Sequence, residues 1–210
     1  RNTIPGVDQL FVYGDYRGGV VPPGYYTARL SNGKQITNCE FAILADPRIE
    51  AEPKDYEYQA RILREIEKQV ADIHLSINKM RVVRDQIHSL VELLERSNEH
   101  KDLISTGRDA IQKIQSWELS FIQIEQQTYQ DAIHLSNGLN AELLDLKQKV
   151  DTPSPNVTEG VKERLQNLTE QWASQKALME NILNQDVGTF NKIFKEKNIP
   201  ALIIPKVSAF

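Results

Sequence analysis

The sequence has one cysteine, Cys39, and no long run of apolar residues. A single thiol excludes a disulfide within the chain and any metal site built from several cysteines. No stretch of about 18 consecutive apolar residues is present, so no membrane-spanning helix is expected. Lys and Arg number 25 against 29 Asp and Glu, and the net charge of −4 gives no basic surface of the kind that binds a nucleic-acid backbone. We therefore expect neither a nucleic-acid partner nor a membrane span.

Patterns of catalysis and metal binding are missing as well. There is no Gly-x-Ser-x-Gly elbow and no glycine-rich loop between a strand and a helix. The four histidines, His74, His88, His100 and His134, are too widely spread to share a metal ion, and we interpret them as surface residues. Cys39 lies on a predicted strand without a nearby histidine, which favours a buried structural thiol over a nucleophile. The sequence therefore predicts no catalytic, cofactor-binding or metal-binding residue, and no enzymatic activity for this chain.

Residues 1–48 have the composition of a small antiparallel β-sheet, with six of the ten glycines and four of the nine prolines. Strands are predicted at 9–13, 24–30 and 35–44, and Ser31-Asn32-Gly33-Lys34 is typical of a hairpin with a type I′ turn. Three strands cannot close a sandwich, and a small sheet with one apolar face is marginally stable in water. Either further strands belong to an upstream segment, or the sheet packs against helices.

Residues 49–198 have the periodicity of long amphipathic helices. The clearest periodic pattern runs from Tyr56 to Leu94. The helix that carries it is expected to begin near Pro53 and to end near Ser97. At 1.5 Å per residue it forms a rod of roughly 60 Å, which needs partners of similar length. Its apolar positions recur every three or four residues and are interrupted only by Arg84. They are Leu63, Ile66, Val70, Ile73, Ile77, Met80, Ile87, Val91 and Leu94.

A second rod is expected to begin between Glu99 and Arg108 and to end before the Thr152-Pro153-Ser154-Pro155 segment. Its apolar pattern weakens before Asn137-Gly138, where we expect a break or a kink. Trp117 occupies a position in its apolar seam and is expected to anchor the core.

The third rod is expected to begin at Asn156, where Glu159 three residues later suggests a capping arrangement, and to end near Lys197. Trp172 is its predicted core anchor. The apolar register slips by one position at Leu183, which should relax the supercoil locally.

Together these patterns predict an α+β protein that is mainly α. A small N-terminal sheet is followed by a long antiparallel three-helix bundle, with coiled-coil-like packing and short turns, or by a four-helix arrangement if the break near Asn137-Gly138 is a true turn. Because the seam is consumed within the chain, we expect a monomer. Arg84 either pairs with an acid across the bundle or covers apolar surface with its stem while its head reaches water, and the second is favoured. The apolar tail, 199–210, is expected to rest on the sheet or on the adjoining end of the bundle.

Several short motifs occur in an order that resembles a known family: Gly19-Val20-Val21-Pro22-Pro23-Gly24-Tyr25-Tyr26-Thr27-Ala28-Arg29-Leu30, then Gly33-Lys34, then Asp46-Pro47-Arg48, then Gln59 within a long helix. The whole chain is similar to the C-terminal region of large bacterial proteins with sortilin-like (VPS10-type, BNR-repeat) β-propellers. These are found mainly in Bacteroidetes and are often labelled glycosyl hydrolase-like. The resemblance implies that 1–48 is part of an immunoglobulin-like or FlgD-like sandwich, 49–198 a closing helical bundle and 199–210 a tail.

The resemblance also implies a function. The chain would be a non-catalytic structural or interaction module of a secreted or cell-envelope protein, with the upstream propeller and a protein along the bundle as its expected partners. The alternative is that it forms part of a hydrolase whose catalytic residues lie in a propeller upstream of Arg1. The beginning at Arg1 rather than Met is expected for a piece of something longer. No catalytic residue carries over from the family to this chain.

Overall fold

The computed structural model describes residues 15–97, 99–120, 122 and 138–199. Within them the chain is mainly helical with one two-stranded antiparallel sheet, which confirms the predicted fold class. The strands are β1, Gly24–Asn32, and β2, Gln35–Ile43. The helices are α1, Pro53–Ser97; α2, Lys101–Leu119; α3, Leu139–Val150; α4, Glu159–Asn181; the π-helical segment η2, Ile182–Val187; and α5, Gly188–Glu196. The predicted strand at 9–13 lies outside the described residues.

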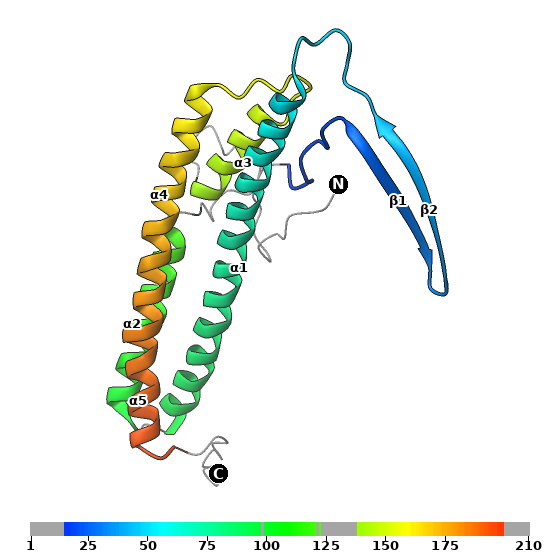
Figure 1. Ribbon diagram of the computed structural model, residues 1–210. Coiled ribbons are helices and arrows are strands. Elements are labelled where there is room, and N and C mark those ends of the chain that lie inside the picture. The colour runs from blue at the N-terminus through cyan, green and yellow to red at the C-terminus, as the bar shows by residue number, and fades with distance from the viewer. Residues whose placement is uncertain (1–14, 98, 121, 123–137, 200–210) are drawn as a thin grey trace, which may run out of the picture.

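The helices form three long rods (Figure 1). The 45 residues of α1 make a single rod of about 67 Å. The second rod consists of α2 and α3, which contact different parts of α1, and α4, η2 and α5 form the third. α2 ends at Leu119, earlier than the sequence predicts, and α3 starts directly after Gly138. Residues 123–137 lie outside the described residues. Because α2 and α3 are separate helices in the described chain, the four-helix alternative is the correct description.

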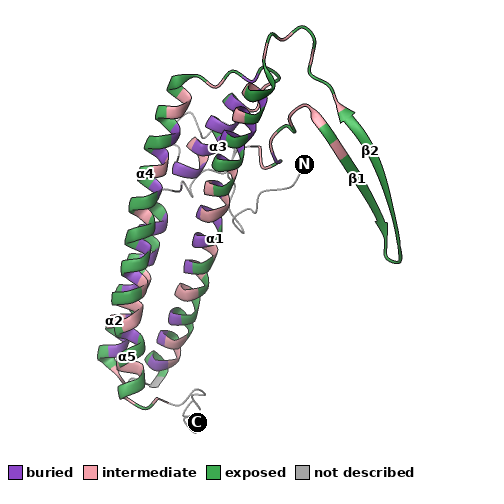
Figure 2. Cartoon of the chain, in the orientation of Figure 1, coloured by how far each residue is buried: buried purple, intermediate pink, exposed green. Residues whose placement is uncertain are grey.

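The predicted seam of α1 forms the core (Figure 2). One buried cluster joins Leu63 to Met80 of α1 with α3, α4 and the C-terminal part of α2. A second cluster, around Ile87, Val91 and Phe190, joins the other end of α1 to α2 and α5. Gly107 of α2 permits the close approach in this second cluster, since a Cβ there would lie 2.5 Å from Val91 Cγ2 and 2.9 Å from Phe190 Cε2. Ile199 packs against this cluster, whereas the rest of the predicted tail lies outside the described residues.

The third rod differs locally from the prediction at two points. The helix begins at Glu159 with Thr158 as its N-cap, and no side chain caps it. The predicted Asn156–Glu159 capping arrangement is therefore wrong, because Asn156 still belongs to the loop that follows the buried Pro155. The one-residue slip at Leu183 falls inside η2. A π-helical turn contains one residue more than an α-helical turn and absorbs such a slip without ending the helix.

The hairpin stands away from the bundle (Figure 1). Asn32 pairs with Gln35 across the two-residue turn Gly33-Lys34. Gly33 is the only one of these two with a positive φ, 59°, which is typical of a type II′ turn, so the predicted type I′ turn is wrong. Neither strand contacts a described helix, and the strands are exposed except near their base. The expectation that the sheet packs against the helices is therefore not met within this part of the chain.

Candidate functional site: the junction of hairpin and bundle

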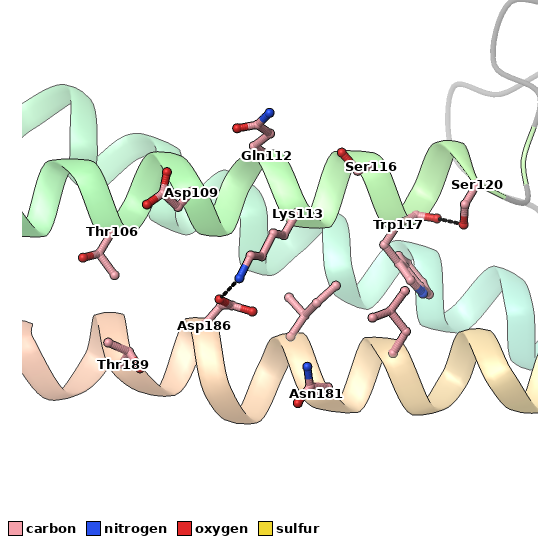
Figure 3. A pocket seen from close by; sticks show the side chains of 12 residues that line it. Thr106, Asp109, Gln112, Lys113, Ser116, Trp117, Ser120, Asn181, Asp186 and Thr189 are labelled. Carbon is pink, nitrogen blue, oxygen red and sulfur yellow. Dashed lines mark hydrogen bonds and ion pairs between the residues drawn. The ribbon is translucent and has the colours of Figure 1, made fainter.

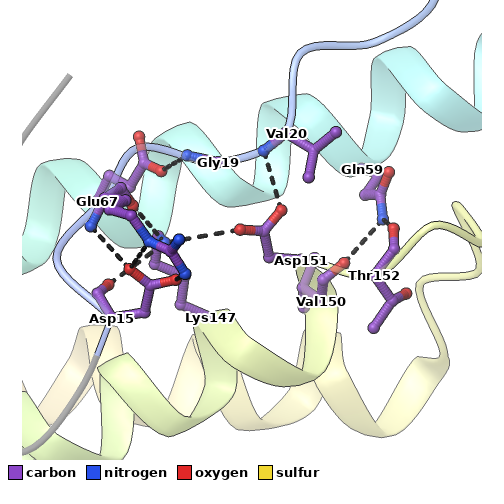
Figure 4. Close-up of polar contacts among 10 residues, drawn as sticks. Asp15, Gly19, Val20, Gln59, Glu67, Lys147, Val150, Asp151 and Thr152 are labelled. Atoms are coloured by element: carbon purple, nitrogen blue, oxygen red, sulfur yellow. Dashed lines mark hydrogen bonds and ion pairs between the residues drawn. The ribbon is translucent and has the colours of Figure 1, made fainter. Parts of the chain in front are cut away.

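Residues 15–20 tie the hairpin to the bundle, and we call them the strap (Figure 4). The side chain of Lys147, 1% exposed, donates to the carbonyl oxygens of Arg17 at 2.6 Å and Asp15 at 3.4 Å. On the opposite side of the strap, the amide of Gly19 donates to the Glu67 carboxylate. These contacts bind the strap through its backbone, so α1 and α3 hold it in place.

Asp151 completes the attachment at the end of α3. Its carboxylate accepts from the amide of Val20 at 2.9 Å and lies 3.8 Å from the Lys147 ammonium. Gly19 itself has no room for a side chain, because a Cβ would lie 2.9 Å from Leu63 Cδ1. The strap is thus fixed immediately before the chain turns into β1.

Gln59 of α1 fixes the neighbouring loop between α3 and α4. Its side-chain amide donates to the carbonyl oxygens of Val150, Thr152 and Ser154, at 2.7, 2.9 and 3.3 Å. Carbonyl groups at the end of a helix have no partner within the helix, and Gln59 supplies one. A cavity of about 140 Å³ at the hairpin base is bordered by this glutamine, by Tyr56 and by both legs of the hairpin.

The segment that leads out of the hairpin, Asp46-Pro47-Arg48, is a turn stabilised by hydrogen bonds between its own residues. The Asp46 carboxylate accepts from the Arg48 backbone amide at 3.0 Å and from its guanidinium at 2.9 and 2.6 Å. These hydrogen bonds hold the pKa of Asp46 below its usual range. The charges satisfy each other, so this motif shapes the return of the chain into α1.

The strap's own ion pair has the same form. The Arg17 side chain hydrogen bonds to the Asp15 carboxylate at 2.9 and 2.7 Å and holds the pKa of Asp15 well below its usual range. Between them, Tyr16 turns toward the core, where its ring lies 5.8 Å from the ring of His74. Burial raises the pKa of Tyr16 to about 12.

A groove of about 680 Å³ runs along the outside of the bundle between α2 and the α4–η2 rod (Figure 3). Lys113 and Asp186 form an ion pair across it at 2.5 Å. Trp117, which lines the groove, donates its indole NH to the carbonyl oxygen of Gln175 at 2.9 Å and so belongs to the packing between rods. Six of the nine other lining residues have a hydroxyl or amide side chain, and no histidine or cysteine is among the lining residues.

The tryptophan predictions are confirmed, whereas two other predictions are wrong. Trp117 and Trp172 are buried, and Trp172 donates to Asp72 at 2.9 Å. His74, predicted to lie on the surface, is fully buried, because the strap covers that side of α1. Cys39, predicted to be buried, is exposed, since no described element covers the hairpin.

The remaining histidines have no shared ligand role in the described chain. His88 is exposed beside Glu92, at 3.7 Å. His100 precedes α2 in a left-handed conformation, and His134 lies outside the described residues. Within the described chain no group of three His, Cys, Asp or Glu side chains is placed to hold a metal ion.

The sequence favoured an Arg84 whose guanidinium reaches water, but the structure shows the other alternative. Its guanidinium lies 2.7 Å from Asp85 and 3.8 Å from Glu118 of α2, so the ion pair across the bundle is present. Arg81 also pairs with Glu118, which is nearly buried. Two arginines of α1 thus compensate one acid of α2.

Sequence reasoning missed Lys147, the central residue of the junction. It lies four positions after Leu143 and shares its helical face, so a lysine stands where an apolar residue is expected. That conflict was the available signal.

No helix in the described part of the chain combines the length and apolar character needed to cross a bilayer. No protein-family model, curated protein or solved structure matches the chain.

Proposed function

We propose that the chain is a non-catalytic structural and interaction module, whose helical bundle holds the hairpin in position for pairing with strands elsewhere in a larger protein. The observation that carries the proposal is the hairpin itself. Both of its outer edges are unpaired among the described residues, and it makes no contact with a described helix. An isolated hairpin is marginally stable, and unpaired strand edges readily accept another strand.

The attachment of the hairpin supports the same proposal. Lys147, Glu67 and Asp151 fix the strap before β1, while the Asp46–Arg48 turn shapes the path after β2. Both legs of the hairpin border one small cavity at the top of the bundle. A strand pair anchored in this way would be presented at a defined place.

The identity of the larger protein rests on the sequence resemblance. We propose a secreted or cell-envelope protein with a sortilin-like β-propeller upstream, in which the hairpin completes an immunoglobulin-like or FlgD-like sandwich. The Pro-Pro-Gly-Tyr-Tyr segment that leads into β1 and the Asp46-Pro47-Arg48 turn are the motifs that support this assignment.

A proline on one strand edge tests the pairing. Because Asn32 and Gln35 flank the two-residue turn, alternation places the Asn38 amide on the outer edge of β2. In the full-length gene product, Asn38→Pro should lower the thermal midpoint of the sheet-containing module, whereas it should leave the bundle of the 210-residue chain unchanged. Equal midpoints for the variant and the parent full-length protein would contradict the proposal.

A hydrolase assay tests the non-catalytic part. We expect no turnover of glycans or peptides by the 210-residue chain. Reproducible hydrolysis that disappears on substitution of one acidic residue would favour the alternative, in which the chain contributes to a hydrolase.

A further inference from the structure

The cavity at the base of the hairpin is enclosed by four parts of the chain. Its volume is about 140 Å³, and residues 20–23, which lead into β1, form one wall. Residues 43–46 at the end of β2 form the second wall, and Thr152 and Pro153 of the α3–α4 loop form the third. Tyr56 and Gln59 of α1 complete the lining. Figure 4 shows Val20, Gln59 and Thr152 at this junction.

The walls of the cavity are held by hydrogen bonds within the chain. The amide of Val20 donates to Asp151 at 2.9 Å, and the Gln59 side chain donates to the carbonyl oxygen of Thr152 at 2.9 Å. Three of the lining residues are prolines, whose φ angles are fixed. A site with such walls is preformed, so a ligand that enters it orders little additional backbone.

The lining is mainly apolar. Eight of the twelve lining residues are aliphatic or proline, and Asp46, the only acid among them, is paired with Arg48. Val21 and Leu44 are 44% and 85% exposed, so the apolar lining reaches the surface of the described chain. A concave apolar surface with few polar groups is typical of a site for an apolar group.

Tyr56 adds a polar group without a partner. The residue is 8% exposed, and its hydroxyl is buried with no hydrogen-bond partner in the described chain. A buried hydroxyl of this kind lowers stability, because it has lost its hydrogen bonds to water. A carbonyl group brought by a ligand would restore a partner.

We propose that this cavity is an anchor pocket, which takes one apolar side chain of the size of phenylalanine from the segment that pairs with the hairpin, while a backbone carbonyl of that segment accepts a hydrogen bond from Tyr56. A cavity of about 150 Å³ accommodates a benzene-sized group. Protein interfaces typically place such anchors in pockets at their centre. Both legs of the hairpin border the pocket, so a segment that adds to either strand passes close to it.

The identity of the occupant rests on the proposed function, whereas the pocket itself is testable in the 210-residue chain. N-acetyl-L-phenylalanine amide carries the expected side chain and carbonyl groups and serves as the probe. We expect saturable NMR shifts of the Val21 and Leu44 methyl groups with this probe, and none with N-acetylglycine amide, which lacks the side chain. The absence of a saturable shift, or equal shifts with both probes, would overturn the inference.

Tyr56→Phe tests the hydroxyl. It should weaken binding of the phenylalanine probe about fivefold, yet it should not lower the melting temperature of the free chain, because the hydroxyl has no partner to lose. The control Tyr58→Phe lies outside the pocket, keeps the ring that Arg61 and Lys162 face, and should leave probe affinity unchanged. Equal probe affinity for Tyr56→Phe and the parent, or a melting temperature lower by more than about 3 °C, would overturn the inference.

The full-length gene product tests the occupant. There Tyr56→Phe should lower the thermal midpoint of the sheet-containing module, in contrast to its effect on the 210-residue chain. If Asn38→Pro lowers this midpoint and Tyr56→Phe does not, the anchor is overturned and the proposed function stands. If the chain binds the probe and Asn38→Pro has no effect, the proposed strand pairing is contradicted and the pocket stands.

Discussion

The side-chain nitrogen of Lys147 lies 2.6 Å from the carbonyl oxygen of Arg17, 130 positions away in the sequence. This contact joins the C-terminal half of the second rod to the strap that leads into β1. It also places a cation in the interior, with Asp151 as the neighbouring acid. The position of the hairpin therefore depends on a polar contact inside the bundle.

Lys147→Met should destabilise the chain by about 3 kcal/mol, because the carbonyl groups of Asp15 and Arg17 and the Asp151 carboxylate lose a buried partner. Chemical denaturation measures this change. The matched control is Lys149→Met, which removes an exposed pair with Asp145 and should cost less than about 1 kcal/mol. Equal losses for the two variants would contradict the assigned role of Lys147.

Gly107→Ala should destabilise the bundle by roughly 1 to 3 kcal/mol, although alanine is the better helix former. The added Cβ would meet Val91 and Phe190 at distances that force packed side chains apart. Gly160→Ala, in the first turn of α4, meets nothing within 4 Å and should be neutral or stabilising. Thermal unfolding of both variants checks the pair, and a stabilising Gly107→Ala would disprove the close approach.

Glu118→Gln should destabilise the chain by about 1 to 2 kcal/mol, because Arg81 and Arg84 lose the charge that they share. The loss is limited, since both arginines are partly exposed and can recover hydration. Glu92→Gln, which affects only the exposed pair with His88, serves as the control and should have a much smaller effect. Denaturant midpoints that shift equally would argue against a special role for Glu118.

Acid should weaken the strap through Asp15. The folded pKa of Asp15 lies below its usual value near 4, so its stabilising contribution is present above that pH and is lost as the pH falls toward the folded pKa. Asp15→Asn should therefore reduce the decrease in melting temperature between about pH 5 and pH 2.5. Arg17→Gln removes the partner and should reduce the slope similarly. Parallel curves for all three proteins would show that this pair is not formed.

Local sequence patterns correctly predicted the buried residues whose position follows from the periodicity of the helix that carries them. The apolar seam of α1, its start at Pro53 and the two tryptophan anchors follow from helical periodicity and the fixed backbone of proline. The burial of His74 and Lys147 instead depends on the strap, which reaches them from more than 50 positions away. No local pattern contains that information.

In the hairpin the error is the opposite one, because a residue predicted to be buried is exposed. The sequence correctly predicts two strands joined by a tight turn, and the burial of Cys39 was inferred from its place on one of them without a nearby histidine. Alternation specifies which face requires a cover but not which segment supplies it. The turn type was also missed, because the pairing register shifts the central turn residues from Asn32-Gly33 to Gly33-Lys34.

Amide hydrogen exchange of β1 and β2 tests the central claim most directly, with the 210-residue chain compared with the full-length gene product. If the bundle presents the hairpin for strand pairing, the outward amides of Thr27, Arg29, Asn38 and Glu40 should exchange at least about 100-fold more slowly in the full-length protein, while amides of α1 remain unchanged. Equal exchange of these strand amides in the two proteins would contradict the account.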